Sequence, residues 1–583
     1  MLKNKRILTS ATGLVIAAVL LVSTQHAQAA AISVTPGATD QTVNGNCSLY
    51  EAVEAANTDA SVDACPAGSG ADTISIPDGA YTISVINLST SSAVSLVGQS
   101  RSGTVLNIDT DYGINKGDGD LSISHLTVKN GFGISGSGDG NVTINDTIWE
   151  NASTSSTWSG INITQSGSDE FTFNITDSIV RGNTNQGNSG AGLYASNFET
   201  INLNNVDVHD NTLGTPSNQD GAIELRGTQA TLNNVDSHNN SNISGLGVAA
   251  QNTEMNQIDS YDNEGSGMGI SPFVGTNQTV ELHNSSVVNN DGEGGLFIVS
   301  KSGGYTVDVD NVTVSNNTTT YSAFFMFSDE NDPAAGTVRN ITIADNTRTG
   351  DIGLPEAPAA IGFISGAQLA PTVEFSNVLL SNNLDETTPR NCVPASSNFF
   401  APISAGHNFS SDSTCSTIFD ETSDLNDKAA GLSALVEVND TWVRPLTAGA
   451  IPVNAGTTVL GITTDQRGVA RPQGSAYDIG AYEFEGTTVT AAPVASADKK
   501  AETLAVTGVI TISSAILISI ILAVLIVIYR DYRKHKQPLT AIDPSVSYTF
   551  GHHLKVVTIP LLRYRIHIQV VKRPSSIDGV HRF

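Results

Sequence analysis

The sequence predicts an all-β solenoid of short strands and tight turns, on the evidence of its composition and its internal repeats. Of 583 residues, only 15% are charged and 6% are aromatic, whereas glycine alone numbers 53. This composition argues against coiled coils and helix bundles, which need many Lys, Glu, Leu and Ala residues. A nine-residue pattern that ends in Asn recurs through the chain, and such self-similarity is typical of solenoids. The repeats are 175–183, 203–211, 232–240, 282–290, 309–317, 338–346 and 375–383.

Each repeat is accompanied by a second segment that begins with glycine and alternates in part between apolar and polar residues, which predicts a strand. The repeats follow one another at intervals of roughly 21 to 37 residues, the range of solenoid coils. Because two or three short strands cannot bury an apolar face alone, stacked repeats are expected to share one core. The glycine-led segments are 190–196, 221–227, 245–251 and 294–300.

The Asn that closes each repeat suits a tight turn, because Asn tolerates left-handed backbone angles and can bond its own main chain. Stacked repeats would align these Asn side chains into ladders. The pattern resembles the right-handed parallel β-helix of the pectate-lyase-like superfamily, and the resemblance implies such a solenoid over residues 101–390. A β-propeller is the alternative, but its blades would be longer and more regular, with a repeating aromatic signature.

Residues 1–29 have the pattern of a secretory signal peptide. A basic start precedes an apolar run over 13–22, and residues 27–29 form an Ala-Gln-Ala cleavage site. The alternative is an N-terminal membrane anchor, but the apolar run is shorter than the ~20 residues that span a bilayer. We therefore expect the chain to be exported.

Residues 30–100 are predicted to hold an N-terminal capping helix and the first coils. Ser48 and Glu51 match a capping box at the start of a short helix that ends at Asn57. Because a solenoid exposes apolar surface at each end, we expect this helix to cover the first coil. Its apolar face consists of Leu49, Ala52, Val53 and Ala56.

The same segment, CSLYEA over residues 47–52, resembles the CSLREA segment with which many secreted bacterial β-helix proteins begin. Tyr50 stands where that family usually has Arg. The likeness continues over residues 63–84 and implies that Cys47 pairs with Cys65. Four cysteines allow three connectivities, and we favour two local disulfides because crossed pairing would have to bridge the whole array. The second local pair would be Cys392 with Cys415.

Residues 391–486 resemble the choice-of-anchor Q module, which precedes varied C-terminal surface anchors. The likeness rests on residues 450–456 and 463–485, together with the cysteine-bounded segment 392–415. Charged residues gather here and could form an acid/base cluster, but we favour ion pairs that fasten the last coil, because charge clusters are often structural. They are Asp465, Arg467, Arg471, Asp478 and Glu483.

The C-terminal part of the chain has the order of a surface anchor. A linker rich in Thr, Ala and Pro over 487–508 leads into an uncharged run over 509–528, which is long enough for a transmembrane helix. The tail, 529–583, is basic, which predicts a cytoplasmic location; its alternating segment 562–570 predicts a strand.

The linker ends in a motif that resembles the sorting signal of class E sortases. That resemblance implies cleavage between Thr507 and Gly508 and transfer of Thr507 to the cell wall. The alternative is a permanent single-pass anchor, because about fifty residues follow the basic cluster. Either way, we expect the chain on the outer face of a bacterial membrane or wall. The motif residues are Leu504, Ala505, Val506, Thr507 and Gly508.

Charge and motif patterns exclude some functions. The formal net charge is −29, with no basic patch for nucleic acid. Polysaccharide lyases on this fold need carboxylates that bind calcium and a basic residue that removes a proton. The basic residues look scattered, without a compelling carboxylate set: Lys116, Lys129, Arg181, Arg226, Lys301 and Arg339.

Candidate metal ligands are equally weak. Three Asp pairs could bind calcium, yet they look like ordinary turn and surface residues of the repeat. His209, His238 and His283 recur at outward or turn positions, which does not suggest a metal site. We therefore predict no catalytic, cofactor-binding or metal-binding residue, with calcium as the one cofactor to consider. The Asp pairs are Asp118 with Asp120, Asp207 with Asp210, and Asp308 with Asp310.

The function expected from these patterns is that of a surface-anchored, adhesin-like protein that binds glycans or serves as a structural stalk. Its partners would be extracellular glycans or another cell's surface, a class E-type sortase, and the membrane through one C-terminal helix. The alternative is a polysaccharide lyase or glycoside hydrolase on the same fold.

Overall fold

The computed structural model describes residues 30–486, apart from short gaps, and two strands near the C-terminus. The predicted signal peptide (1–29), the linker with its motif (487–508) and the predicted membrane helix (509–528) lie outside the described residues. Within the described part of the chain, no helix is long and apolar enough to cross a membrane. The gaps are 90–91, 111–112, 132, 137, 156–157, 167–169, 188, 273–277, 301–303, 329–332, 351–357, 366–370 and 394–398.

The chain divides into two compact units, Met1–Gly508 and Val509–Phe583. In the second unit, β37 (Lys555–Leu561) pairs antiparallel with β38 (Tyr564–Val570). β38 confirms the strand that the alternation over 562–570 predicts.

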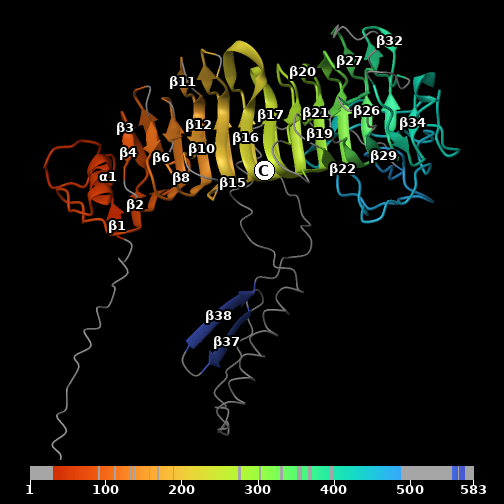
Figure 1. The fold of residues 1–583 in the computed structure, drawn as a ribbon. Helices are drawn as coiled ribbons and strands as arrows, with labels where there is room; N and C mark the ends of the chain where they lie inside the picture. The colour runs from red at the N-terminus through yellow and green to blue at the C-terminus, as the bar shows by residue number, and fades with distance from the viewer. Residues whose placement is uncertain are drawn as a thin grey trace, which may run out of the picture. The chain divides into compact units, whose positions relative to one another are not determined.

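The first unit is a parallel β-helix, as the repeats predict. One 29-stranded sheet winds through its coils, and Figure 1 shows the coils stacked side by side from β1 to β34. Successive strands of a coil lie on three faces, which we call A, B and C in chain order. Face A consists of β1 (Ala31–Ser33), β2 (Asp72–Ile76), β5 (Val94–Gly98), β8 (Leu121–Lys129), β10 (Val142–Glu150), β13 (Thr172–Arg181), β15 (Ala191–His209), β16 (Thr212–His238), β17 (Ser241–Tyr261), β19 (Gln278–Val288), β22 (Tyr305–Ser315), β25 (Ala335–Arg339), β29 (Thr372–Ser376) and β33 (Ile403–Ser404).

Several of these strands are long enough to turn a corner and contribute to a second or third face. Face B contains the C-terminal parts of β8, β10, β13, β15, β16, β17, β19 and β22, together with β3 (Gly79–Ile83), β6 (Thr104–Ile108), β26 (Thr342–Ala344), β30 (Leu379–Ser381) and β34 (Phe409–Ser410). Face C contains the N-terminal parts of β15, β16 and β17, together with β4 (Ile86–Leu88), β7 (Ile114–Lys116), β9 (Ile134–Gly136), β12 (Ser159–Thr164), β18 (Met268–Ile270), β21 (Leu296–Val299), β24 (Phe324–Ser328) and β28 (Ile361–Ser365).

Short strands pair in the turn between faces B and C. They are β11 (Ser153–Thr154), β14 (Thr184–Asn185), β20 (Asp291–Gly292), β23 (Thr318–Thr319), β27 (Thr347–Arg348), β31 (Leu384–Asp385) and β32 (Thr388–Pro389).

The core lies inside the solenoid, where inward positions carry apolar side chains that stack coil upon coil. Because strand residues alternate between faces of a sheet, each inward residue contacts its equivalents one coil before and after it. One such row on face A is at most 1% exposed throughout. It consists of Ile144, Ile175, Leu203, Leu232, Met255, Leu282, Val309, Val338 and Phe375.

The predicted Asn ladder is present in the turn after face B. The side-chain Nδ2 of each ladder Asn donates to the Oδ1 of the next at 2.8–3.0 Å, and every member is at most 1% exposed. The left-handed residue is the one before the ladder Asn, for example Asp210 (φ 56°) and Asn289 (φ 57°). The tight turn therefore uses one residue for its backbone angle and the next for its amide. The ladder consists of Asn183, Asn211, Asn240, Asn263, Asn290, Asn317, Asn346, Asn383 and Asn391.

The N-terminal end is covered by α1 (Leu49–Thr58), one residue longer than predicted. Its capping box is formed: Glu51 N–H donates to Ser48 Oγ at 3.2 Å, and Ser48 N–H donates to Glu51 Oε2 at 2.9 Å. A disulfide joins Cys47 to Cys65, and the Tyr50 hydroxyl bonds Ser84. Figure 1 shows α1 at the end of the coil stack. The buried face of the helix includes Leu49, Ala52, Val53 and Ala56, as predicted.

At the other end, the second disulfide joins Cys392 to Cys415, which lies in a short 3-10 helix, Ser413–Cys415. The chain then turns back and lies against face B. A hairpin of β35 (Val436–Val438) and β36 (Thr441–Val443) places the Thr441 hydroxyl 3.1 Å from Asp259 Oδ1 on β17. We call residues 425–485 the C-terminal segment.

We expect Asn290→Ala to lower the free energy of unfolding by about 2–3 kcal/mol, because it removes the acceptor of the buried Asn263 backbone N–H and the side-chain donor to Ser260 and Asn317. Urea denaturation of residues 30–485 measures the loss. Asn233→Ala is the matched control in an earlier coil: Asn233 is only partly buried, so its change should stay within about 0.5 kcal/mol. Equal losses for the two variants would contradict the role of the ladder.

Candidate functional site

Face C carries a row of outward residues that continues in register through eight consecutive coils. Their neighbours in each strand point inward and form the core, as the alternation of a strand requires. Residues of this row therefore lie next to one another along the stack of coils, whatever their distance in sequence. In order, the row is Asn162, Tyr194, Glu224, Gly247, Gly269, Phe297, Phe325 and Gly362.

Two consecutive glycines in this row leave a groove of about 650 Å³, which we call the face C groove. Gly247 and Gly269 form part of its floor, between Glu224 on one side and Phe297 on the other. A Cβ at Gly247 would lie 2.1 Å from a carboxylate oxygen of Glu224, so that the Glu224 side chain lies over this glycine. At Gly269 the nearest atom would be 3.9 Å away, in ordinary contact distance. The groove thus exists because two coils lack an outward side chain.

An aromatic cluster forms one wall of the groove. The Phe297 ring meets Phe325 edge-on, with centroids 5.7 Å apart, and Tyr321 lies 5.8 Å from Phe297 and 5.2 Å from Phe325. Phe327, Val299 and Ile364 extend the same apolar surface. Aromatic rings held at these angles offer rigid, apolar contact area to a ligand.

Polar groups face the aromatic wall from the remaining sides. Glu224 is 6% exposed and accepts a hydrogen bond from Arg226 Nε at 3.2 Å. Glu293 lies in the turn before β21, where Ser266 Oγ accepts its backbone N–H at 3.1 Å. The groove therefore combines an apolar wall with two carboxylates and serine hydroxyls, the mixture typical of small-molecule sites.

The glycine-led segments 221–227, 245–251 and 294–300 predict strands, and β16, β17 and β21 confirm them. The groove was not predicted, because a groove on a solenoid depends on which residues of successive coils come into register. The available signal was the contrast between GLGVAA and GMGI, with glycine at the outward position, and LFIV and FFMF, with phenylalanine there. Aligning these segments by their inward residues would have revealed it.

The candidate calcium ligands lie beside basic side chains. Near Asp118 and Asp120, the Lys116 ammonium donates to the backbone carbonyls of Gly117 at 3.0 Å and Asp139 at 2.9 Å. Burial lowers the pKa of Lys116, and the nearby carboxylates oppose that shift. A protein cation thus occupies the place that these carbonyls could have offered to calcium.

The other two Asp pairs are likewise engaged by protein side chains. Asp207 lies 3.1 Å from His238 Nε2, and Asp210 lies 2.8 Å from His209 Nδ1. Asp308 and Asp310 both contact Arg339. In the described part of the chain, no group of three or more His, Cys, Asp or Glu residues could hold a metal ion.

Several of the basic residues that look scattered in the sequence form ion pairs with carboxylates in the structure. Lys129 and Arg181 both bind Glu150, at 2.7 and 2.9 Å. Burial raises the pKa of Glu150, but its hydrogen bonds to these two cations outweigh burial and lower the pKa overall. The three residues come from successive coils in register, so their spacing in sequence concealed the contact. Arg226 pairs with Glu224, and Arg339 with Asp308, whereas Lys301 lies outside the described residues.

The charged residues of the C-terminal segment are buried and paired with one another. Arg467 contacts Asp465 at 2.6 Å, and Arg471 contacts Glu483 at 3.0 Å, with each side chain at most 2% exposed. Both guanidinium groups also donate to backbone carbonyls of the segment. Burial raises the pKa of Asp478 to about 6. These contacts tie the loops of the segment together.

A second buried cluster lies on face B, where the rings of His209, His238 and Tyr261 stack with centroids 5.0 and 4.5 Å apart. Trp442 of the C-terminal segment packs on Tyr261 at 5.6 Å. Burial alone would lower the pKa of His238, but the hydrogen bond and charge of Asp207, with the charge of Asp236, raise it above 6.5. When protonated, His238 therefore stabilises the buried carboxylates of Asp207 and Asp236.

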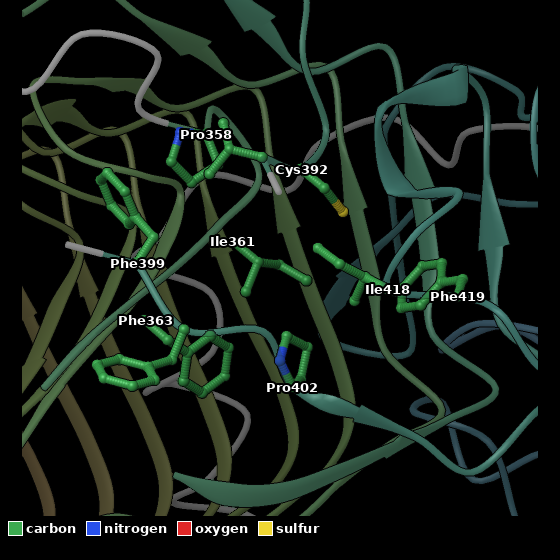
Figure 2. Close-up of a pocket in the computed structure, with 10 residues that line it drawn as sticks. Pro358, Ile361, Phe363, Cys392, Phe399, Pro402, Ile418 and Phe419 are labelled. Atoms are coloured by element: carbon green, nitrogen blue, oxygen red, sulfur yellow. The ribbon is translucent and has the colours of Figure 1, made fainter. Parts of the chain in front are cut away.

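A small apolar cavity of about 10 Å³ lies at the C-terminal end of the solenoid. Figure 2 shows Ile361 of β28 in the middle of the lining, with Phe399 and Phe363 on one side of it and Ile418 and Phe419 on the other. Such a volume holds about one water molecule. We interpret it as a packing defect behind the second disulfide, where the last coil is closed.

Because the pKa of His238 is raised in the folded state, its contribution to stability is complete below pH 6.5 and is lost as pH rises through the folded-state value. We expect the free energy of unfolding to fall over that interval, and His238→Gln to reduce the slope. Denaturation of both proteins at several pH values measures the two stability profiles. Asp478 is present in both proteins, so its contribution cancels in the difference between the profiles. Parallel pH profiles for the two proteins would contradict this role.

No family model and no curated protein matches the chain. Among solved structures, it is similar to the pectate lyase Pel9A, with 14% identity and a TM-score of 0.32 over 78% of this chain and 97% of that one. It is also similar to the A-module of the Azotobacter vinelandii mannuronan C-5 epimerase AlgE4, with 13% identity and a TM-score of 0.32 over 62% of this chain and 97% of that one. Because these identities and TM-scores are low, the fold is assigned from the strand registers described above, and the groove is interpreted from its own residues.

Proposed function

We propose that this chain is a surface-displayed β-helix that binds an extracellular glycan in the face C groove. The observation that carries the proposal is the gap left by Gly247 and Gly269, with aromatic rings on one side and the Glu224–Arg226 pair on the other. A sugar ring has apolar C–H faces and a rim of hydroxyl groups. It can therefore pack on Phe297 while its hydroxyl groups bond the carboxylates.

A peptide fits the groove less well. Peptides commonly bind sheets by adding a strand to an edge, where backbone groups are free. Here the floor strands β17 and β18 each pair on both sides, with β16 and β21 as the outer neighbours. Recognition at this face must therefore come from side chains, which favours a ligand with its own hydroxyl groups and apolar ring faces.

A polysaccharide-active enzyme is the second candidate. Glu224 and Glu293 line the same groove, and glycoside hydrolysis uses a pair of carboxylates across the scissile bond. Arg226, beside Glu224, is the kind of residue that a lyase would use as its base. We rank binding first, because Glu224 is already held by the Arg226 guanidinium.

We also propose that the protein is exported and held at the bacterial surface. Its sequence carries a signal-peptide pattern, a sorting-like motif and an uncharged run before a basic tail. The two disulfides support export, because such bonds persist in oxidising compartments. The likeness to CSLREA and choice-of-anchor Q segments agrees with this location and remains part of the proposal.

The binding proposal predicts that Gly269→Phe fills the groove and weakens glycan binding at least tenfold, because its Cβ has room while its ring occupies the ligand's space. Residues 30–485 are screened on a glycan array with and without calcium, and hits are titrated. Asn115→Phe is the matched control, since it adds the same ring to an exposed position of face C outside the groove.

Failure of the folded fragment to bind any glycan, or equal binding by both variants, would contradict the proposal. Release of reducing ends or unsaturated sugars that Glu224→Gln abolishes would establish the enzyme instead.

For the anchor, we expect mass spectrometry of wall digests to find Thr507 as a C-terminal residue joined to wall peptide, because the motif is followed by a membrane-length run and a basic tail. Thr507→Ala should abolish that species. Recovery of the intact chain with its tail from the membrane fraction would contradict sorting and support the permanent helix.

A further inference from the structure

The row of outward residues on face C continues beyond the groove to a second aromatic group. Tyr194 pairs in register with Glu224, which is the first side chain beyond the glycine gap. Four coil steps separate Tyr194 from Phe297 along this row. Because neighbouring strands lie ~4.8 Å apart, the two aromatic positions are separated by about 19 Å along the stack of coils.

Tyr194 is held in place by its neighbours. Its ring packs against Trp158, with centroids 4.8 Å apart and planes inclined by 35°. Trp158 in turn lies over Gly190, where any Cβ would meet its ring at 2.1 Å. We call Trp158 and Tyr194 the second platform. A supported ring of this kind loses little freedom when a ligand packs on it.

The Glu224–Arg226 pair lies between the second platform and the groove. The guanidinium carbon of Arg226 is 5.9 Å from the centre of the Tyr194 ring, while its Nε bonds Glu224. The Arg226 side chain is 47% exposed, so it can reach a ligand at either side. Along one line the face therefore offers an aromatic ring, a charged hydrogen-bonding pair, a glycine floor and an aromatic wall.

From this arrangement we infer that the ligand is a linear oligosaccharide that lies along the axis of the solenoid and contacts the second platform and the groove at once. The inference rests on the proposed glycan-binding function and adds its direction and minimum length. A single sugar can occupy only one of two sites that are about 19 Å apart. A chain that occupies both gains affinity, because its second contact is intramolecular.

Three oligomer series test the inference by titration calorimetry against residues 30–485: β-1,4-glucan, β-1,4-N-acetylglucosamine and α-1,4-galacturonate, each from disaccharide to heptasaccharide. For at least one series, we expect affinity to rise at least tenfold between the disaccharide and the hexasaccharide. Tyr194→Ala should collapse that ratio towards one. If loss of Tyr194 disturbs the coil, Arg226→Ala tests the same affinity ratio by changing an exposed side chain instead.

The controls separate this inference from the proposed function. Asn162→Ala changes the next residue of the row beyond Tyr194 and should leave the ratio as in the wild type. Binding that is independent of chain length, yet abolished by Gly269→Phe, would overturn the inference and keep the groove as a binding site. No binding by any series would overturn the inference, whereas the proposed function falls only if the glycan array is also negative.

Discussion

The amide ladder in the turn after face B holds successive coils in register, and the rest of the molecule depends on that register. Asn290 donates one N–H to Asn317 of the next coil and the other to the backbone carbonyl of Ser260. Its own Oδ1 accepts from the backbone and side chain of Asn263. Because these groups are buried, a slipped coil would leave several of them unpaired, and it would also turn inward residues outward.

Register converts a sequence into rows of side chains, and both polar and ligand-binding features of this protein arise from such rows. Lys129, Glu150 and Arg181 form an ion-pair network because they occupy equivalent positions in three successive coils. The face C groove arises in the same way, where Gly247 and Gly269 follow Glu224 in register. Stacking equivalent positions thus allows a gap of two side chains to become a ligand-sized groove without any change in the backbone path.

Local signals were predictable from the sequence, whereas features that depend on register were not. The capping box of Ser48 and Glu51 involves residues three apart, and the repeat itself indicated the strands and the Asn ladder. The two local disulfides close short loops and were also expected. The Glu150 network and the groove join residues 21 to 31 positions apart, and the interval between coils varies. The ion-pair partner of Arg181 and the free space over Gly269 could not be identified from the sequence, because the sequence does not show which residues face inward in each coil.

Faces B and C of the solenoid differ in role because of the contacts that the C-terminal segment makes. It lies on face B, where Thr441 bonds Asp259, Arg444 donates to Ser315, and Trp442 packs on Tyr261. These contacts bury polar side chains that would otherwise face water, so face B contributes to stability. The outward groove residues Gly269 and Phe297 alternate with core residues of their strands, so a side chain at either position points away from the core. A rigid coil stack can therefore keep its fold while its outward residues on face C set which ligand it binds.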